Sequence, residues 1–156
     1  MDISPVISIL QLDPGRLQDR DLRLELTEFS PHVVHLVPTY HFRMIDAETE
    51  FEAGTINLRL GWDDNLILYA GHIGYGVYEA FRGRRYASRS VELLKALARR
   101  HGFSEMWITC NPENLASKRS CELAGAEYIE TVDVPETSQY YARGIRHKRR
   151  YRLAIV

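Results

Sequence analysis

Most apolar residues in this chain alternate singly with polar ones, but one long segment places them every three or four residues instead. Such spacing predicts an amphipathic helix with one buried side. The buried-side positions are Val91, Leu94, Leu97, Ala98 and His101. Gly102 follows, where glycine commonly ends a helix in the left-handed conformation. Residues 73–77 alternate with strand period, so residues 71–102 are expected to form a strand, a tight turn and a long helix.

The same patterns place the remaining elements. Strands are expected at about residues 22–27, 38–45, 55–60, 105–110, 126–134 and 149–155, with a second helix from Asn111-Pro112 to about Ala124. Residues 135–148 form a polar connection that is longer than a tight hairpin needs. We therefore expect one domain, residues 1–156, of the α/β (α+β) class, with a mixed, largely antiparallel central sheet flanked by helices.

Composition narrows the class of protein. The 156 residues carry a net charge of −1, which does not favour a general polyanion binder, and 45% are hydrophobic, as in ordinary globular domains. No apolar run approaches the length of a membrane span, and the N-terminus lacks the pattern of a signal peptide. Cys110 and Cys121 are the two cysteines, without a CxxC spacing. These features favour a reduced, cytoplasmic protein with no membrane association and no metal site.

The turn before the long helix carries the most distinctive chemistry. Residues 82–87, RGRRYA, place three arginines and a glycine where the helix begins. The first N–H groups of a helix lack intrahelical partners, so this corner can bind an anion such as a phosphate. A merely basic, solvated turn is the ordinary alternative. On the preceding strand, Gly74 and Gly76 share one face, which indicates that something approaches that backbone closely.

Two motifs carry a family resemblance. The run Arg82-Gly83-Arg84-Arg85-Tyr86-Ala87 resembles the Gln/Arg-x-x-Gly-x-Gly/Ala motif of the GNAT superfamily of acyl-CoA-dependent N-acyltransferases, with Arg85 in place of the central glycine. Downstream, NLASKRSCELAGA is similar to a box of the ribosomal-protein N-terminal acetyltransferase branch, through Asn114, Ser117, Glu122 and Gly125. The resemblance covers roughly residues 39–156. It implies a GNAT-like fold with a shortened N-terminal region, because little room remains for the two helices that usually precede the sheet.

The resemblance also implies an activity and the residues that serve it. The expected function is an N-acetyltransferase that moves an acetyl group from acetyl-CoA to a primary amine by direct transfer in a ternary complex. The strand backbone would hold the pantetheine arm and polarise the thioester carbonyl, and the corner would bind the pyrophosphate. The implied cofactor-binding residues are Tyr75, Gly76, Val77, Arg82, Gly83, Arg84, Arg85, Tyr86, Ala87, Asn114 and Ser117. For Asn114 and Ser117, helix capping is an alternative.

Arg85 leaves two conformations open. With a negative φ its N–H can still donate to a phosphate, whereas a positive φ would strain the turn.

Candidates for proton transfer are less distinctive. His72, on the central strand, is the candidate general base, with His41 a lesser one and a chain of waters as the alternative. Cys121 occupies the position where many relatives carry a tyrosine acid, although a small buried residue is its ordinary interpretation. His101 reads as a helix-end residue, and His32 and His35 as exposed loop residues.

Two other functions compete with the enzyme. One is a CoA-binding or regulatory module without catalysis. The other is a nucleic-acid-associated interaction protein that uses the basic run at residues 143–152, RGIRHKRRYR. That run is more simply a solvated loop and a charge-protected edge strand, or a contact for an anionic acceptor. We expect a small-molecule or peptide amine as partner rather than a nucleic acid, and leave a homodimer open.

Overall fold

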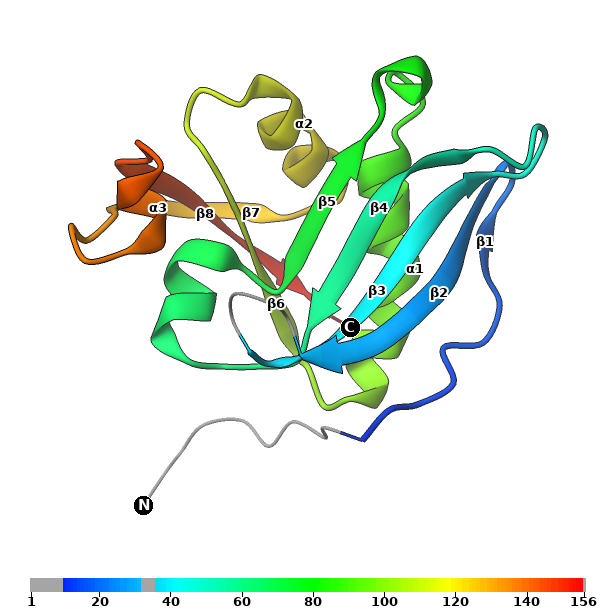
Figure 1. The fold of residues 1–156 in the computed structure, drawn as a ribbon, viewed down its shortest axis with the longest axis horizontal. Coiled ribbons are helices and arrows are strands. Elements are labelled where there is room, and N and C mark those ends of the chain that lie inside the picture. Colours follow the sequence, from blue (N-terminus) through cyan, green and yellow to red (C-terminus); the bar gives the residue numbers. More distant parts are fainter. Residues whose placement is uncertain (1–9, 32–35, 156) are drawn as a thin grey trace.

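The computed structural model describes residues 10–31 and 36–155, so His32 and His35 lie outside the described part. Within these two ranges, thirteen elements follow one another (Figure 1). They are β1 (Leu17–Asp19), β2 (Leu22–Pro31), β3 (Pro38–Asp46), β4 (Glu52–Arg59), the π-helical turn η1 (Leu66–Ala70), β5 (Ile73–Val77), the 3-10 turn η2 (Glu79–Phe81), α1 (Tyr86–Arg100), β6 (Glu105–Cys110), α2 (Leu115–Leu123), β7 (Glu127–Asp133), α3 (Gln139–Ala142) and β8 (His147–Ala154).

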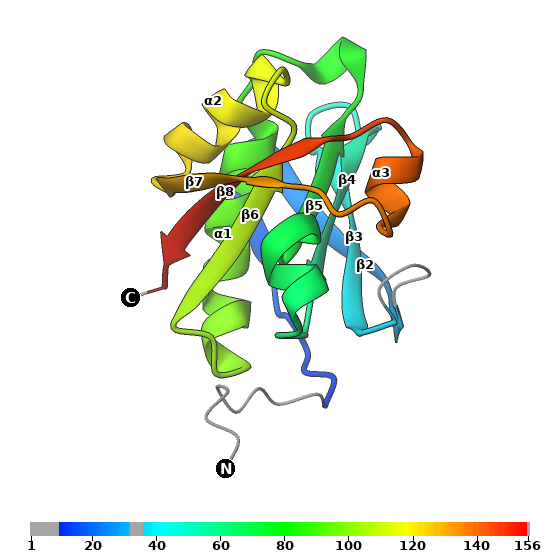
Figure 2. The ribbon, with the colours of Figure 1, turned by 90° about the vertical axis from the view of Figure 1, so that its left-hand side faces the viewer.

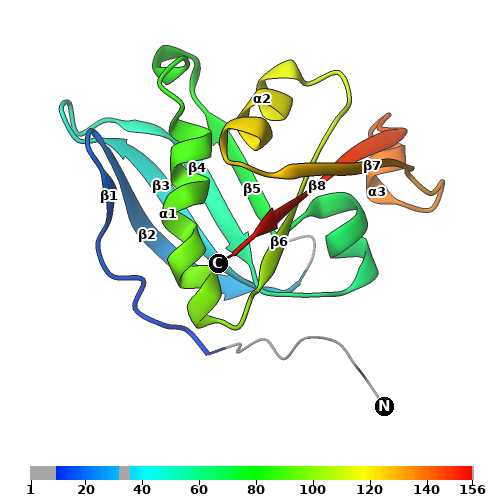
Figure 3. The ribbon, with the colours of Figure 1, turned by 180° about the vertical axis from the view of Figure 1, so that it is seen from behind.

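The strands form two antiparallel sheets. One has the order β1-β2-β3-β4-β5, and the other has the order β6-β8-β7. Helix α1 lies across one face of the larger sheet, as the view from behind shows (Figure 3). The smaller sheet stands beyond β5, with α2 at one end of it and α3 at the other (Figure 2). One hydrophobic core joins both sheets and α1, and includes Phe42, Leu94, Ile108 and Tyr151.

The two sheets touch at one end and separate at the other. The N–H of His72 donates to the carbonyl of Trp107 at 2.7 Å, which ties the start of β5 to β6. Beyond that point β5 pairs with β4 and β6 pairs with β8, and no strand of the described residues pairs with the outer edge of β5. The outer edge of β5 therefore has no partner strand among the described residues, in the region where α2 lies (Figure 1).

The expected α/β class and GNAT-like arrangement are confirmed, with the sheet divided in two at the β5–β6 junction. Residues 10–31 contain β1 and β2 and no helix. The second helix begins at Leu115 rather than at Asn111-Pro112, because the side chain of Asn114 caps it. The polar connection at 135–148 contains α3, and β8 starts earlier than expected, at His147.

Candidate functional site

A groove of about 610 Å³ runs between β5, the start of α1 and α2. We call it the β5–α2 groove. It contains ten of the eleven cofactor-binding residues expected from the sequence: Tyr75, Gly76, Val77, Arg82, Gly83, Arg85, Tyr86, Ala87, Asn114 and Ser117. Phe81, Ala116, Arg119, Ser120 and Leu123 complete its lining. The strand edge, the helix start and the second motif, far apart in sequence, therefore face one space.

The helix start inside this groove has the properties of an anion site. No side chain caps α1, and the side chains of Arg82 and Arg85 are both exposed along the groove. Arg82 is held by a hydrogen bond from its Nε to the carbonyl of Val77 at 3.3 Å. Uncapped helical N–H groups and two guanidinium groups together favour a phosphate or pyrophosphate.

Arg85 adopts the less favourable of its two conformations. It is the N-cap of α1 with φ 61° and ψ 27°, which lies in the left-handed region where a Cβ is strained. Gly83 nearby has φ 89°, which glycine adopts without cost. The central position of the motif therefore has the backbone geometry that a glycine would supply, with an arginine in it.

Arg84 is the expected residue that does not line the groove. Its Nη1 lies 3.6 Å from Oδ2 of the buried Asp46, and its guanidinium lies 5.2 Å from the centre of the Phe81 ring. The interaction with Tyr86, followed by the charge of Asp46, raises the pKa of the Arg84 guanidinium. Arg84 therefore connects the corner to the end of β3 and lies outside the lining of the groove.

The start of α1 is anchored to the turn between β1 and β2. Arg89 donates to Asp19 at 2.6 Å and to Asp21 at 2.7 Å, and the hydroxyl of Tyr86 donates to Asp21 at 2.8 Å. The hydrogen bond from Arg89 lowers the pKa of both carboxyl groups. Tyr86 is buried, so its side chain supports the corner from beneath while its backbone begins the helix.

The two strand glycines serve different purposes. A Cβ at Gly76 would meet nothing within 4 Å, so this position is open toward the groove. A Cβ at Gly74 would collide with Nη2 of Arg59 and lie 2.9 Å from Oδ1 of Asn57. The close approach expected from the glycine pattern is therefore made at Gly74 by the chain's own arginine.

Asn114 and Ser117 lie at the groove and at the helix start together. Oδ1 of Asn114 accepts a hydrogen bond from the N–H of Ser117 at 3.1 Å, which is the capping geometry. Both residues also line the β5–α2 groove. Capping and facing a ligand are thus not alternatives at these two positions, because the cap itself forms part of the wall.

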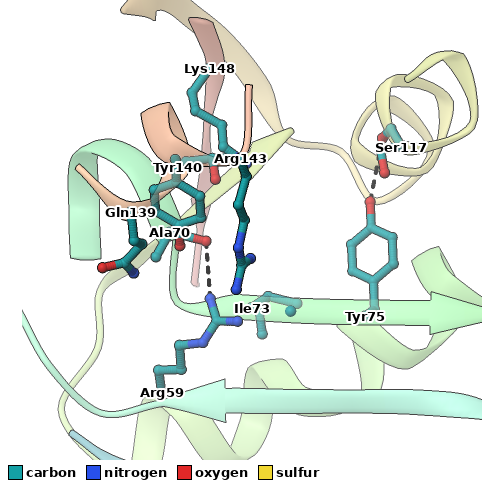
Figure 4. A pocket seen from close by; sticks show the side chains of 11 residues that line it. Arg59, Ala70, Ile73, Tyr75, Ser117, Gln139, Tyr140, Arg143 and Lys148 are labelled. Atoms are coloured by element: carbon teal, nitrogen blue, oxygen red, sulfur yellow. Dashed lines mark hydrogen bonds between the residues drawn. The ribbon is translucent and has the colours of Figure 1, made fainter. Parts of the chain in front are cut away.

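A second pocket, of about 370 Å³, lies on the other side of Tyr75 (Figure 4). We call it the β5-edge pocket. Its lining residues are Arg59, Ala70, Ile73, Gly74, Tyr75, Thr109, Ser117, Gln139, Tyr140, Arg143 and Lys148. Tyr75 and Ser117 line both spaces, and the Tyr75 hydroxyl donates to the carbonyl of Ser117 at 3.4 Å. Burial raises the pKa of Tyr75, so its hydroxyl keeps its proton.

Three cations line this pocket. Arg59 is buried, and its Nη1 donates to the carbonyls of Ala70 at 3.0 Å and Gly71 at 2.9 Å. Arg143 and Lys148 come from the connection around α3 and from β8. The sequence did not reveal this cluster, because the strand alternation predicts that the side chain of Arg59 is exposed to solvent. The nearby Gly74 was the available signal, since a buried side chain explains a glycine there.

His72 is not placed to act as a general base. It is fully buried, its Nδ1 accepts the N–H of Trp107 at 2.9 Å, and its Nε2 lies 2.9 Å from the carbonyl of Gly61. The ring also stacks on Trp62 with centroids 4.8 Å apart. Burial lowers the pKa of His72 to about 4. Both ring nitrogens are engaged within the protein, and the ring lines neither the groove nor the pocket, so we infer a structural role for His72.

The other expected proton-transfer residues also lie away from the two spaces. Cys121 is buried and faces Cys110, and that contact together with burial raises the pKa of its thiol. His101, expected at the end of the helix, is the C-cap residue of α1 and is also buried, with Nε2 lying 2.6 Å from the hydroxyl of Tyr40. Neither they nor His41 are among the lining residues of the groove or the pocket.

Most of the basic run at 143–152 is occupied by neighbours. Arg150 pairs with Glu130 at 3.2 Å, Arg152 pairs with Glu127 at 3.0 Å, and Arg149 lies 4.0 Å over the ring of Tyr128. The expected charge-protected edge strand is wrong, because β8 is the central strand of its sheet, between β6 and β7, and its arginines reach partners on β7. Arg143 and Lys148 differ from these arginines, because they face the β5-edge pocket.

Comparison with known proteins places these features in context. A family model described as an acetyltransferase (GNAT) domain matches residues 17–127. No sequence among curated proteins is similar enough to match this chain. Among solved structures, a proposed ribosomal-protein-serine acetyltransferase from Vibrio cholerae aligns with a TM-score of 0.63 and 16% identity, over 92% of this chain and 99% of that one.

Two further structures show the same fold. The Salmonella typhimurium acetyl transferase that modifies the N-terminal serine of 50S ribosomal subunit protein L7/L12 aligns with a TM-score of 0.58 and 22% identity, over 76% of this chain and 64% of that one. The microcin C7 self-immunity acetyltransferase MccE, in complex with acetyl-CoA and AMP, aligns with a TM-score of 0.57 and 16% identity, over 75% and 61%. This chain therefore spans less than two thirds of these two relatives.

None of the helices in residues 10–31 and 36–155 has the length and apolar character that crossing a membrane requires. In the same residues, no three His, Cys, Asp or Glu side chains gather as they would around a metal ion.

Proposed function

Because this chain belongs to the GNAT acetyltransferase family, we propose that it is an acetyl-CoA-dependent N-acetyltransferase that acetylates a primary amine by direct transfer in a ternary complex. One observation carries the proposal. The β5–α2 groove, which suits a long phosphate-bearing ligand, and the β5-edge pocket, which suits a small one, share Tyr75 and Ser117 as their common wall. The acetyl donor can therefore bind on one side of Tyr75 and Ser117, and the amine acceptor on the other.

The residues present fit acetyl-CoA. The uncapped start of α1, with Arg82 and Arg85, would hold the pyrophosphate. The outer edge of β5 at Tyr75 and Val77 offers backbone groups to the pantetheine amides, and the open space beside Gly76 admits the arm. Acetyl-CoA supplies an acyl carbon that its thioester makes reactive toward an amine.

The β5-edge pocket would hold the acceptor. Part of its wall comes from η1 and α3. The relative from Salmonella acts on the N-terminal serine of a ribosomal protein. For this chain we infer a small-molecule or peptide amine, because the pocket of about 370 Å³ is small.

We assign proton donation to the hydroxyl of Tyr75 in place of Cys121. The hydroxyl lies at the wall between the two spaces, whereas the Cys121 thiol is buried behind it. No Asp or Glu occurs among the lining residues that the structure describes, so no carboxylate is assigned as a base. The three cations of the pocket instead lower the pKa of a bound ammonium group, which favours the reactive neutral amine.

A CoA-binding module without transfer is the second candidate, favoured by that lack of a lining carboxylate. We also infer a cytoplasmic protein, since the adjacent Cys110 and Cys121 are both free thiols. A homodimer stays a prediction.

The experiment combines calorimetry with CoA and a thiol-release assay with acetyl-CoA and a panel of amines. Arg82→Glu should weaken CoA binding at least about tenfold, the size of effect that losing a charge-assisted hydrogen bond produces. Arg99→Glu makes the same charge change at an exposed position near the far end of α1 and should leave binding unchanged. Equal CoA affinities of the two variants would contradict the assignment of the β5–α2 groove as the CoA site. CoA binding without turnover of any amine would favour a CoA-binding module without catalysis.

A further inference from the structure

We propose that the β5-edge pocket takes an amine that carries an anionic group, a carboxylate or a phosphate, within a few bonds of its nitrogen. The inference rests on the proposed acetyl transfer and names the class of acceptor. Its starting point is charge: Arg59, Arg143 and Lys148 all line the pocket, and no acidic side chain of the described residues lines it with them.

Arg59 is the centre of this site because it is a buried cation without a counter-ion. Its residue is 9% exposed, and among the described residues it makes no ion pair. Backbone carbonyls of Ala70 and Gly71 accept from Nη1, while Nε is buried with no hydrogen-bond partner in the described part of the chain. A buried guanidinium is normally paired with a carboxylate or phosphate, so this one indicates an anion supplied from outside.

The position of Arg59 is built rather than accidental. Its Nη2 lies where a Cβ at position 74 would be, so the strand has a glycine that leaves room for the guanidinium. A flexible surface arginine needs no such accommodation. The glycine, the two carbonyl acceptors and the burial together fix one guanidinium at the floor of the pocket.

Arg143 and Lys148 close over the pocket from the opposite side. Figure 4 shows the side chain of Arg143 extending toward Arg59, with Lys148 above it. Burial, and then the nearby charges of Arg59 and Arg143, lower the pKa of Lys148, while Cys110 and Glu113 act in the opposite direction. Glu113 neither lines the pocket nor pairs with Lys148 among the described residues.

This electrostatic setting discriminates between amines. A bare ammonium ion is repelled by three cations, whereas an amine joined to a carboxylate or phosphate enters with its charge balanced. The anion then pairs with the guanidinium groups, and the neighbouring nitrogen is left where positive charge favours its neutral form. The pocket volume of about 370 Å³ lies at the small end for ligand sites, which suits a compact group.

The test compares matched amines with the full chain and acetyl-CoA. Phosphoethanolamine is paired with ethanolamine for the phosphate source, and β-alanine with β-alaninamide for the carboxylate source. Because Arg59 also holds two backbone carbonyls, Arg143→Met is the principal variant and Arg59→Met the second. Arg146→Met is the matched control, since Arg146 is an exposed arginine of the same connection that stacks on Tyr141 and does not line the pocket.

The wild-type kcat/KM should favour the anionic member of at least one pair by roughly 10- to 100-fold, the contribution expected of hydrogen bonds to a charged group. Arg143→Met should lose most of that preference while keeping its KM for acetyl-CoA, and Arg146→Met should keep the preference. Equal rates for both members of each pair in the wild type would overturn the inference and leave acetyl transfer standing.

Direct binding measurements separate recognition of the anionic amine from acetyl transfer. Calorimetry with phosphoethanolamine and β-alanine measures occupancy of the pocket without any reaction. If these amines bind, Arg143→Met weakens the binding and no amine is turned over, the anion site is supported and the acetyltransferase activity is rejected. Absence of both binding and turnover would reject both.

Discussion

The backbone N–H of Trp107 donates a hydrogen bond to Nδ1 of His72 over 2.9 Å, and so joins β6 to the residue that precedes β5. With Nε2 lying 2.9 Å from the carbonyl of Gly61, both ring nitrogens have partners inside the protein. The neutral ring with its proton on Nε2 satisfies both contacts, and a protonated ring cannot accept from Trp107. His72 therefore connects the start of β5 to β6, at the end where the two sheets meet.

These contacts of His72 predict that the folded protein loses stability at acidic pH. Burial lowers the pKa of His72 from 6.5 to about 4, so the unfolded chain binds a proton at a higher pH than the folded one. The resulting stability is present above pH 6.5 and is lost as the pH falls toward 4, by up to about 3 kcal/mol. Denaturant unfolding between pH 7.5 and 4.5 measures it. His72→Gln should flatten this dependence, and an unchanged slope would contradict the role assigned to the ring.

Tyr75 and Cys121 should respond differently to substitution. Tyr75→Phe removes the hydroxyl at the wall between the two spaces and should lower kcat about 100-fold, at the low end of the effect of general acid–base groups. Cys121→Ala should change kcat less than about tenfold, because the thiol is buried behind that wall. Steady-state kinetics with acetyl-CoA and the best acceptor measure both. A larger loss for Cys121→Ala would return the acid role to the thiol.

Arg85→Gly should raise the free energy of unfolding. At φ 61° glycine avoids a left-handed penalty of about 1–2 kcal/mol but adds about 0.4–1 kcal/mol of chain entropy, which leaves a gain of about 0.5–1 kcal/mol. Arg85→Ala is the control, since it removes the same charge and keeps the Cβ. Thermal or denaturant unfolding compares the two, and an equal gain in both would trace the effect to charge rather than backbone strain.

The glycines of β4 and β5 should separate folding from binding. A Cβ at Gly54 would collide with the carbonyl oxygen of Gly76, so Gly54→Ala should cost about 1–3 kcal/mol of unfolding free energy, as overpacking does. Gly76→Ala meets nothing within 4 Å and should fold normally, but its methyl group enters open space along the groove and should weaken CoA binding. Calorimetry and denaturant unfolding give both quantities. Normal CoA affinity in Gly76→Ala would place the pantetheine elsewhere.

The elements and the groove could be predicted because their determinants are local. The helix period through Leu94 and Leu97, the strand alternation at 73–77 and the arginine–glycine corner each lie within one segment. The direction of the Arg84 side chain could not be predicted, because it depends on Asp46, which only the folded chain brings within 3.6 Å. The corner could be recognised, but the partner of each arginine in it could not.

The proton-transfer residues and the acceptor site depend on contacts that no local pattern contains. His72 has the ordinary properties of a catalytic histidine in sequence, and it is the distant Gly61 and Trp107 that occupy its nitrogens. The β5-edge pocket combines Arg59 on β4 with Arg143 beyond α3, which lie 84 positions apart. The positive charge of this pocket could not be predicted from the sequence, because only the folded chain brings these segments together.

The walls of the β5-edge pocket that η1 and α3 supply belong to connections between strands, whereas the β5–α2 groove is built from a core strand and two framework helices. Connections tolerate substitution and changes of length better than packed elements do. Exchanging residues 66–70 and 135–146 for segments of other sequence should therefore redirect which amine is modified while the donor half is retained. Selectivity for the amine acceptor can therefore be changed through these two connections without altering the single core that the acetyl-CoA groove depends on.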